Sequence, residues 1–264
     1  MRMPVKPDAW IRPYRTHGEQ IRLICFPYAG GGPQVFQKWV EWLPASVGLY
    51  AVHLPGRGTR MRDAPIDQLG PIVSALVDAL RPMQYLPFAF FGHSMGALLA
   101  FETARALRPS GSAPRLLIVS GCRSPRLIEG REKMHNLSEE SFIRKLAELG
   151  GTPAEVFQHK ELLELLMPTL RADFAVIDSY NYTPITPLNC PITALAGAQD
   201  DFAPASMMKE WQLETLGSFS MNRIQGQHFF IHDSEIEISS IVVRNIRDYF
   251  SVPESDFTSG LLRI

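Results

Sequence analysis

Phe88-Ala89-Phe90-Phe91-Gly92-His93-Ser94-Met95-Gly96 is the stretch of sequence that decides the fold. Its apolar and aromatic beginning is typical of a buried strand. The small and apolar residues that follow it, up to Ala104, have helical spacing. A Gly-x-Ser-x-Gly pentapeptide between a strand and a helix is the pattern of a nucleophile elbow, a strained turn that holds the serine hydroxyl clear of the sheet. We therefore predict that Ser94 is a nucleophile, in preference to an incidental serine in a glycine-rich turn.

The composition excludes several classes of protein. With 26 basic and 27 acidic residues the formal net charge is -1, so no overall field recruits nucleic acid or an anionic membrane. Three well-separated cysteines without a Cys-x-x-Cys spacing predict neither a disulfide framework nor a zinc site, and they fit a reducing compartment. The basic N-terminus lacks the apolar segment of a secretory signal, and the apolar runs are too short to span a bilayer. We expect a soluble, cytoplasmic protein.

Strand-like and helix-like segments alternate along the chain. The predicted strands are 21–26, 49–54, 88–91, 116–120, 192–196 and 219–224, and the predicted helices are 34–43, 68–80, 95–107, 204–214 and 235–250. This alternation predicts an α/β fold with a mostly parallel sheet flanked by helices on both faces. In such a sheet the catalytic loops gather at the carboxyl ends of the strands.

A long segment without strand character interrupts this alternation between Ser120 and Ile192. Ser138 is the predicted N-cap of a first helix, which Gly150-Gly151 would end. A second, leucine-rich helical stretch runs on to Tyr180. We predict a helical lid insertion over about residues 122–188 rather than a mere decoration. The chain 1–264 is then one domain, with a core of about residues 20–121 and 190–250.

A serine nucleophile needs a histidine base, and in this fold the chain order is serine, acid, histidine. That order eliminates five of the seven histidines, because His17, His53 and His93 precede the serine and His135 and His159 fall in the insertion. His228 lies in Gly226-Gln227-His228-Phe229-Phe230, directly after the last predicted strand, and is the predicted base. His232 is interpreted as a surface or capping residue beside Asp233.

The acid should follow an earlier strand. The strand 116–120 runs into Gly121-Cys122-Arg123-Ser124, which contains no carboxylate. The strand 192–196 runs into Gly197-Ala198-Gln199-Asp200-Asp201. We predict Asp200 as the acid, with Asp201 as the alternative and helix capping near Pro204 as its other role. The sequence itself does not distinguish the two aspartates, so the choice of Asp200 rests on analogy.

An oxyanion hole needs two converging backbone N–H groups. The residue after the nucleophile, Met95, supplies one at the start of a helix. The second should come from Phe26-Pro27-Tyr28-Ala29-Gly30-Gly31-Gly32, which follows the first predicted strand. No Gly-Lys-Ser/Thr follows these glycines, so they do not form a phosphate-binding loop. We assign the second donor to Ala29, with Tyr28 as the alternative.

Several motifs together resemble those of type II thioesterases, the discrete editing hydrolases of modular polyketide synthases and nonribosomal peptide synthetases. They are the glycine-rich loop just quoted, Leu54-Pro55-Gly56-Arg57-Gly58, Gly-His-Ser-Met-Gly-Ala, Gly-x-His-Phe-Phe, Leu149-Gly150-Gly151-Thr152-Pro153 and Met167-Pro168-Thr169-Leu170-Arg171-Ala172-Asp173-Phe174. The similarity runs from about Ile21 to Phe250. Gln227 departs from the pattern, since a glycine is expected before the histidine.

The resemblance implies an α/β-hydrolase fold and removal of acyl groups from the phosphopantetheine arm of acyl or peptidyl carrier proteins. It places the catalytic roles on Ser94, Asp200 and His228 and the oxyanion donors on Ala29 and Met95. No metal or organic cofactor is required, the partners are carrier domains of a synthase, and we expect a monomer. The alternatives are a general carboxylesterase or acyl-CoA hydrolase, an acyltransferase, and a non-catalytic carrier-binding protein.

Arginines follow two of the predicted core strands. Arg57, Arg60 and Arg62 come after one strand, and Arg123, Arg126 and Arg131 come after another. Both groups are therefore expected at the catalytic edge of the sheet. We hypothesise that some of them bind the phosphate of the pantetheine arm or acidic residues of the carrier. The alternative is that these arginines are solvated charges on surface loops without a binding role.

Overall fold

A computed structural model of the chain describes residues 9–129, 133–151 and 154–250. Within them, seven strands form one sheet in the order β1-β3-β2-β4-β5-β6-β7. The strands are β1 (Ile11–Arg15), β2 (Ile21–Phe26), β3 (Val47–Val52), β4 (Phe88–His93), β5 (Leu116–Ser120), β6 (Ile192–Gly197) and β7 (Phe219–Ile224). All neighbouring pairs are parallel except β1 with β3. The predicted mostly parallel α/β sheet is confirmed.

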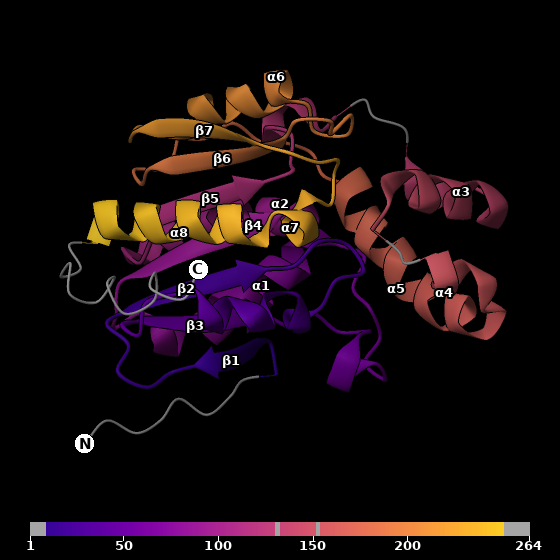
Figure 1. Cartoon of the computed structure of the whole chain (residues 1–264), viewed down its shortest axis with the longest axis horizontal. Coiled ribbons are helices and arrows are strands. Elements are labelled where there is room, and N and C mark those ends of the chain that lie inside the picture. The colour runs from indigo at the N-terminus through magenta and orange to yellow at the C-terminus, as the bar shows by residue number, and fades with distance from the viewer. Residues whose placement is uncertain (1–8, 130–132, 152–153, 251–264) are drawn as a thin grey trace.

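The central strands are buried along their whole length, because helices cover both faces of the sheet (Figure 1). The predicted bounds of β2, β5 and β7 are confirmed. The prediction for β3 is wrong by two residues at each end. Strand β1 was not predicted; it pairs antiparallel at the edge and its register shifts at Pro13, where a proline weakens any strand pattern.

The helices that cover the sheet are α1 (Leu69–Leu80), α2 (Met95–Leu107), α6 (Ala205–Met208), α7 (Phe230–Asp233) and α8 (Glu235–Phe250). Helices α1 and α2 pack in the larger apolar cluster, and α8 packs in the cluster on the opposite face. The predicted helix 34–43 is a 3-10 helix, η1 (Pro33–Glu41), and the predicted helix 204–214 splits into α6 and the 3-10 helix η7 (Lys209–Glu214). Helices α2 and α8 have the predicted bounds.

The insertion between β5 and β6 contains α3 (Glu139–Leu149), α4 (Ala154–Gln158) and α5 (Lys160–Asp178), which form a separate lobe beyond the sheet in Figure 1. Ser138 caps α3 as predicted, since its Oγ accepts a hydrogen bond from the N–H of Ser141 at 3.3 Å. Gly150 ends α3 in the left-handed conformation, with φ 78°. Among the described residues, none of the helices has the length and hydropathy that a membrane crossing requires.

Candidate active site

Ser94 lies in a strained turn between β4 and α2. Its φ of 53° and ψ of -120° make it the one non-glycine residue with positive φ among those described. Its backbone N–H donates to the carbonyl of Ser120 on β5 at 2.8 Å, which holds the turn against the neighbouring strand. A side chain here costs backbone energy, and such strain persists where the surroundings enforce it, as at many active sites. The predicted elbow geometry is therefore present.

Two glycines make room for this turn. A Cβ on Gly92 would overlap the carbonyl of Gly96, and a Cβ on Gly96 would overlap the carbonyl of Phe26 on β2. Both obstacles are backbone atoms, which cannot rotate away as a side chain can. The close approach of α2 to β2 and β4 therefore depends on glycine at both positions.

Gly96→Ala should lower the free energy of unfolding by about 3 kcal/mol, the upper end of typical overpacking costs, because neither backbone can yield locally. Gly70→Ala is the matched control, since a Cβ there meets no atom within 4 Å and Gly70 lies in α1. It should be neutral or stabilising by about 0.5–1 kcal/mol. Urea unfolding measures both, and equal effects of the two substitutions would contradict the argument.

His228, Asp200 and Ser94 form one hydrogen-bonded chain. His228 Nε2 lies 3.0 Å from Ser94 Oγ, and His228 Nδ1 lies 2.9 Å from Asp200 Oδ2. A carboxylate only accepts, so Nδ1 donates to it and leaves Nε2 of the neutral ring as the acceptor for the serine hydroxyl. Asp200 and His228 are both buried, while Ser94 is partly exposed. This is the arrangement in which a histidine can take a proton from a serine.

The structure separates the two adjacent aspartates. Asp200 Oδ1 accepts the backbone N–H groups of Phe202 and Ala203 at 2.9 and 3.0 Å, and its other oxygen faces His228. Asp201 is exposed, and α6 has no side-chain cap at Pro204. The suggested capping role of Asp201 is therefore wrong, because Asp200 makes the turn bonds as well as the histidine contact.

The loop around the histidine tolerates Gln227. The left-handed conformation in this loop is taken by Gly226, with φ 123°, and not by Gln227. His232 is exposed, as expected for a surface residue, but its Nε2 makes a hydrogen bond with the Tyr28 hydroxyl at 2.8 Å. Burial raises the pKa of Tyr28 to about 12, so the phenol keeps its proton at neutral pH.

Both predicted oxyanion donors are found at the cavity that holds the serine. Ala29 and Met95 line the same cavity as Ser94 and His228. Met95 is the first residue of α2, where backbone N–H groups lack partners within the helix. On the other side, the N–H of Gly31 donates to the carbonyl of Tyr28 at 2.9 Å and closes a tight turn around Ala29.

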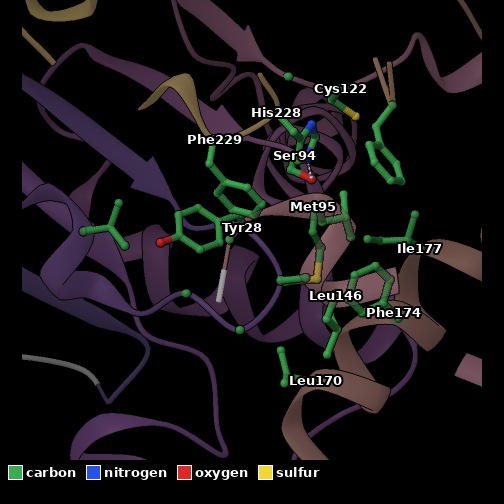
Figure 2. A pocket seen from close by; sticks show the side chains of 18 of the residues that line it. Tyr28, Ser94, Met95, Cys122, Leu146, Leu170, Phe174, Ile177, His228 and Phe229 are labelled. Atoms are coloured by element: carbon green, nitrogen blue, oxygen red, sulfur yellow. Dashed lines mark hydrogen bonds between the residues drawn. The ribbon is translucent and has the colours of Figure 1, made fainter. Parts of the chain in front are cut away.

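The cavity has a volume of about 260 Å³ and is mainly apolar. Figure 2 shows Ser94 and His228 at one side of it and Leu146, Leu170, Phe174 and Ile177 across from them. These four residues come from α3 and α5 of the insertion. The insertion therefore supplies an apolar wall opposite the nucleophile, as an acyl chain would need.

His93, next to the nucleophile, is fully buried, and its Nδ1 lies 2.9 Å from Ser120 Oγ. Burial, aided by the charge of His228, holds the pKa of His93 well below its usual value. The ring therefore stays neutral in the folded protein while it takes up a proton in the unfolded chain below pH 6.5.

The free energy of unfolding should consequently fall as pH drops below 6.5, by up to about 1.4 kcal/mol per pH unit from His93 alone, because the unfolded state binds the extra proton. His93→Asn should reduce this slope. His17→Asn, which removes an exposed ring, should leave it unchanged. Denaturant unfolding between pH 5 and 7 measures the slopes, and equal slopes for His93→Asn and the wild type would contradict the assignment.

Among the described residues, the arginines of the two predicted groups make different contacts. Arg57 is buried, and its guanidinium makes a paired contact with Asp173, so its terminal nitrogens already have a carboxylate partner. A phosphate contact at Arg57 stays a prediction. Arg60 pairs with Asp63 at 2.7 Å and lies over Trp10.

The other arginines differ in their surroundings. Arg126 pairs with Glu214 at 2.7 Å, and Arg123 Nε donates to the carbonyl of Phe202. Arg62 is exposed, and Arg131 lies outside the described residues. Of the five arginines that the structure describes, Arg57 and Arg123 line the cavity. Binding of a carrier by these arginines stays a prediction.

Sequence reasoning missed Asp173 of the insertion. It is 1% exposed, lies 2.7 Å from both Arg57 and the N–H of Gly30, and stands among buried apolar residues of α5. A carboxylate in the apolar face of a helix was the available signal, because such a group needs a partner when it is buried. Cys25, Cys122 and Cys190 are buried free thiols, and no group of three potential metal ligands occurs among the residues described.

Residues 21–249 match a family model described as "Thioesterase domain", which covers most of the chain. The thioesterase PikA5 of Streptomyces venezuelae is 38% identical over 89% of this chain and 85% of its own length. The chain belongs to the thioesterase family. It is accordingly a hydrolase of the serine type within the α/β-hydrolases.

Solved structures agree with this assignment. The thioesterase RedJ from the prodiginine pathway of Streptomyces coelicolor superposes with a TM-score of 0.83 at 37% identity, covering 92% of this chain and 96% of RedJ. YbtT, a type II thioesterase from the yersiniabactin pathway, gives a TM-score of 0.82 at 31% identity, covering 92% and 100%. The resemblance to type II thioesterases inferred from the motifs is confirmed.

Proposed function

We propose that this thioesterase edits a modular synthase, by hydrolysing acyl groups from the phosphopantetheine arm of its acyl or peptidyl carrier proteins. The observation that carries the proposal is the chain from Asp200 through His228 to Ser94, open to an apolar cavity. The similarity to RedJ and to the type II enzyme YbtT supports this class of substrate.

In the proposed reaction Ser94 Oγ attacks the thioester carbonyl and gives its proton to His228 Nε2. Asp200 holds the ring in the required tautomer and stabilises the imidazolium. The N–H groups of Ala29 and Met95 bind the oxyanion. The carbon–sulfur bond then breaks, and His228 returns the proton to the departing pantetheine thiolate. Water then gives a proton to His228 and attacks the acyl-Ser94 ester. The ester bond breaks, His228 returns the proton to Ser94 Oγ, and a carboxylic acid is released.

The cavity favours an apolar acyl group. Its wall opposite Ser94 is formed by leucine, phenylalanine and isoleucine side chains of α3 and α5. A fully extended polar or charged acyl group would leave its polar atoms without partners there. The predicted monomeric state and cytoplasmic location stay predictions.

The test is hydrolysis of a panel of acyl groups, each loaded on a carrier protein, on coenzyme A, on a small thiol and on a simple alcohol, with Ser94→Ala as control. We expect the highest kcat/KM for carrier-bound thioesters and free carboxylic acid as the product. Preference for simple esters would indicate a general esterase, preference for coenzyme A thioesters an acyl-CoA hydrolase, and acyl transfer to an amine or hydroxyl an acyltransferase. Binding of the carrier without turnover would indicate a binding protein.

A further inference from the structure

A buried carboxylate of the insertion is bonded to the glycine-rich loop beside the nucleophile. Asp173, on α5, accepts the backbone N–H of Gly30 at 2.7 Å through Oδ2. The same carboxylate accepts both terminal nitrogens of Arg57, at 2.7 Å each. Asp173 and Arg57 are 1% and 6% exposed, so these charge-assisted bonds lie away from water, where they are strong.

Arg57 extends the connection to a second point of the loop. Its Nη1 also donates to the carbonyl of Gly31 at 3.1 Å, and its Nε donates to the carbonyl of Pro55 at 3.2 Å. Asp173 and Arg57 together therefore hold Gly30 by its N–H and Gly31 by its carbonyl. The residue immediately before these two is Ala29, the proposed second oxyanion donor.

The helix itself rests against the same loop. Leu170, one turn before Asp173, packs so closely over Gly30 that a Cβ at Gly30 would overlap its side chain. Thr169 donates from its hydroxyl to the carbonyl of Gly56 at 2.7 Å, in the loop that carries Arg57. Helix α5 is thus bonded both to the loop after β2 and to the loop after β3.

We propose that Asp173 is a positioning residue, through which helix α5 of the insertion fixes the Ala29 peptide for oxyanion binding. The inference rests on the proposed function, because it assigns Ala29 that role. It follows that the insertion does more than cover the cavity. Its docked position completes the oxyanion hole, and the rate of hydrolysis depends on α5 staying in contact with the loop.

Asp173→Asn tests the proposal with a side chain of the same shape. Asparagine can still accept one hydrogen bond, but its amide presents N–H groups to the donors of Arg57, so the pairing is lost. A displaced peptide near the reacting atoms lowers catalysis by about 10²-fold. We expect kcat for thioester hydrolysis to fall by about that factor while KM changes less than about threefold.

Asp178→Asn is the matched control. Asp178 lies at the end of the same helix with a fully buried side chain, but its Oδ2 binds the backbone and ring nitrogens of His135, away from the glycine-rich loop. A role of Asp173 in stability alone would make the two substitutions equivalent. We expect Asp178→Asn to leave kcat within about threefold of the wild type, even where the substitution lowers Tm.

Ligand binding separates positioning from a general loss of structure. A trifluoromethyl ketone bearing the acyl chain forms a tetrahedral adduct with Ser94 whose oxygen occupies the oxyanion hole, whereas the corresponding thioether has no such oxygen. Asp173→Asn should weaken the ketone by about 10²-fold and the thioether less than about threefold. Equal weakening of both ligands, or no weakening of the ketone, would overturn the proposal.

Arg57→Lys is a milder second variant that keeps the positive charge but cannot bond to the carboxylate and the carbonyl of Gly31 together. It should weaken the ketone selectively by about tenfold, and it decides the question if Asp173→Asn does not fold. A wild type that forms no ketone adduct and hydrolyses no carrier-bound thioester would overturn the proposed function itself. A fully active wild type with an equally active Asp173→Asn variant would overturn only the inference.

Discussion

Ser94→Ala is expected to lower kcat for thioester hydrolysis by about 10⁶-fold, the loss seen when a serine nucleophile is removed from a working triad. The hydroxyl supplies the atom that forms the acyl-enzyme, so no other group can replace it at this position. The substitution keeps a Cβ on the same strained backbone, with φ 53°, and the fold should be unchanged. Rates with carrier-bound substrate measure the effect, and binding of the thioether confirms an intact cavity.

Ser94→Gly adds a control that separates strain from chemistry. It should be as inactive as Ser94→Ala, yet more stable to denaturant by about 1 kcal/mol, because glycine adopts positive φ without the penalty of a side chain. Residual hydrolysis above 1 part in about 10³ of the wild-type rate in both variants would contradict the assignment of Ser94 as the nucleophile.

Asp200→Asn is expected to lower kcat by about 10⁴-fold. Asparagine can keep its oxygen on the N–H groups of Phe202 and Ala203, so the turn survives. Its amide nitrogen would then face His228 Nδ1, which favours the ring tautomer that carries the proton on Nε2 and cannot accept from Ser94.

Asp201→Asn is the matched control for this experiment, because it makes the same chemical change one residue further on, at an exposed side chain. It should leave kcat within about twofold, as expected for a surface substitution. Steady-state kinetics of the two variants decide between the aspartates. A larger loss from Asp201→Asn would move the acid to that residue.

The parts of the structure that could be predicted are those specified by neighbours in sequence. Helix α2 has the predicted bounds because the elbow starts it, and β2 and β5 are short apolar runs with clear ends. Helix η1 begins with Pro33 directly after three glycines, and it forms as a 3-10 helix, which the apolar pattern alone does not distinguish from an α-helix.

The same holds for the candidate site, where residues specified by their neighbours in sequence could be predicted and contacts between distant segments could not. Ser94, Asp200 and His228 each follow a strand, and their place in a parallel sheet brings them together, so chain order and position after a strand could predict them. Only the structure shows that Asp200, and not Asp201, contacts His228. The pairing of Arg57 could not be predicted, because its partner Asp173 lies 116 positions away, in an insertion whose docking no local pattern specifies. A buried ion pair between such distant segments is visible only once the fold is known.

The most direct test of the central claim, hydrolysis through one acyl-Ser94 intermediate, is partitioning between water and hydroxylamine. The same acyl group is supplied on a carrier protein and on a small thiol. The ratio of carboxylic acid to hydroxamate is measured for the product formed above the uncatalysed reaction of hydroxylamine with the thioester. A common acyl-enzyme has lost its leaving group, so the ratio must be the same for both substrates, and both products must vanish with Ser94→Ala. A ratio that depends on the leaving thiol, or products that persist in the variant, would contradict the mechanism.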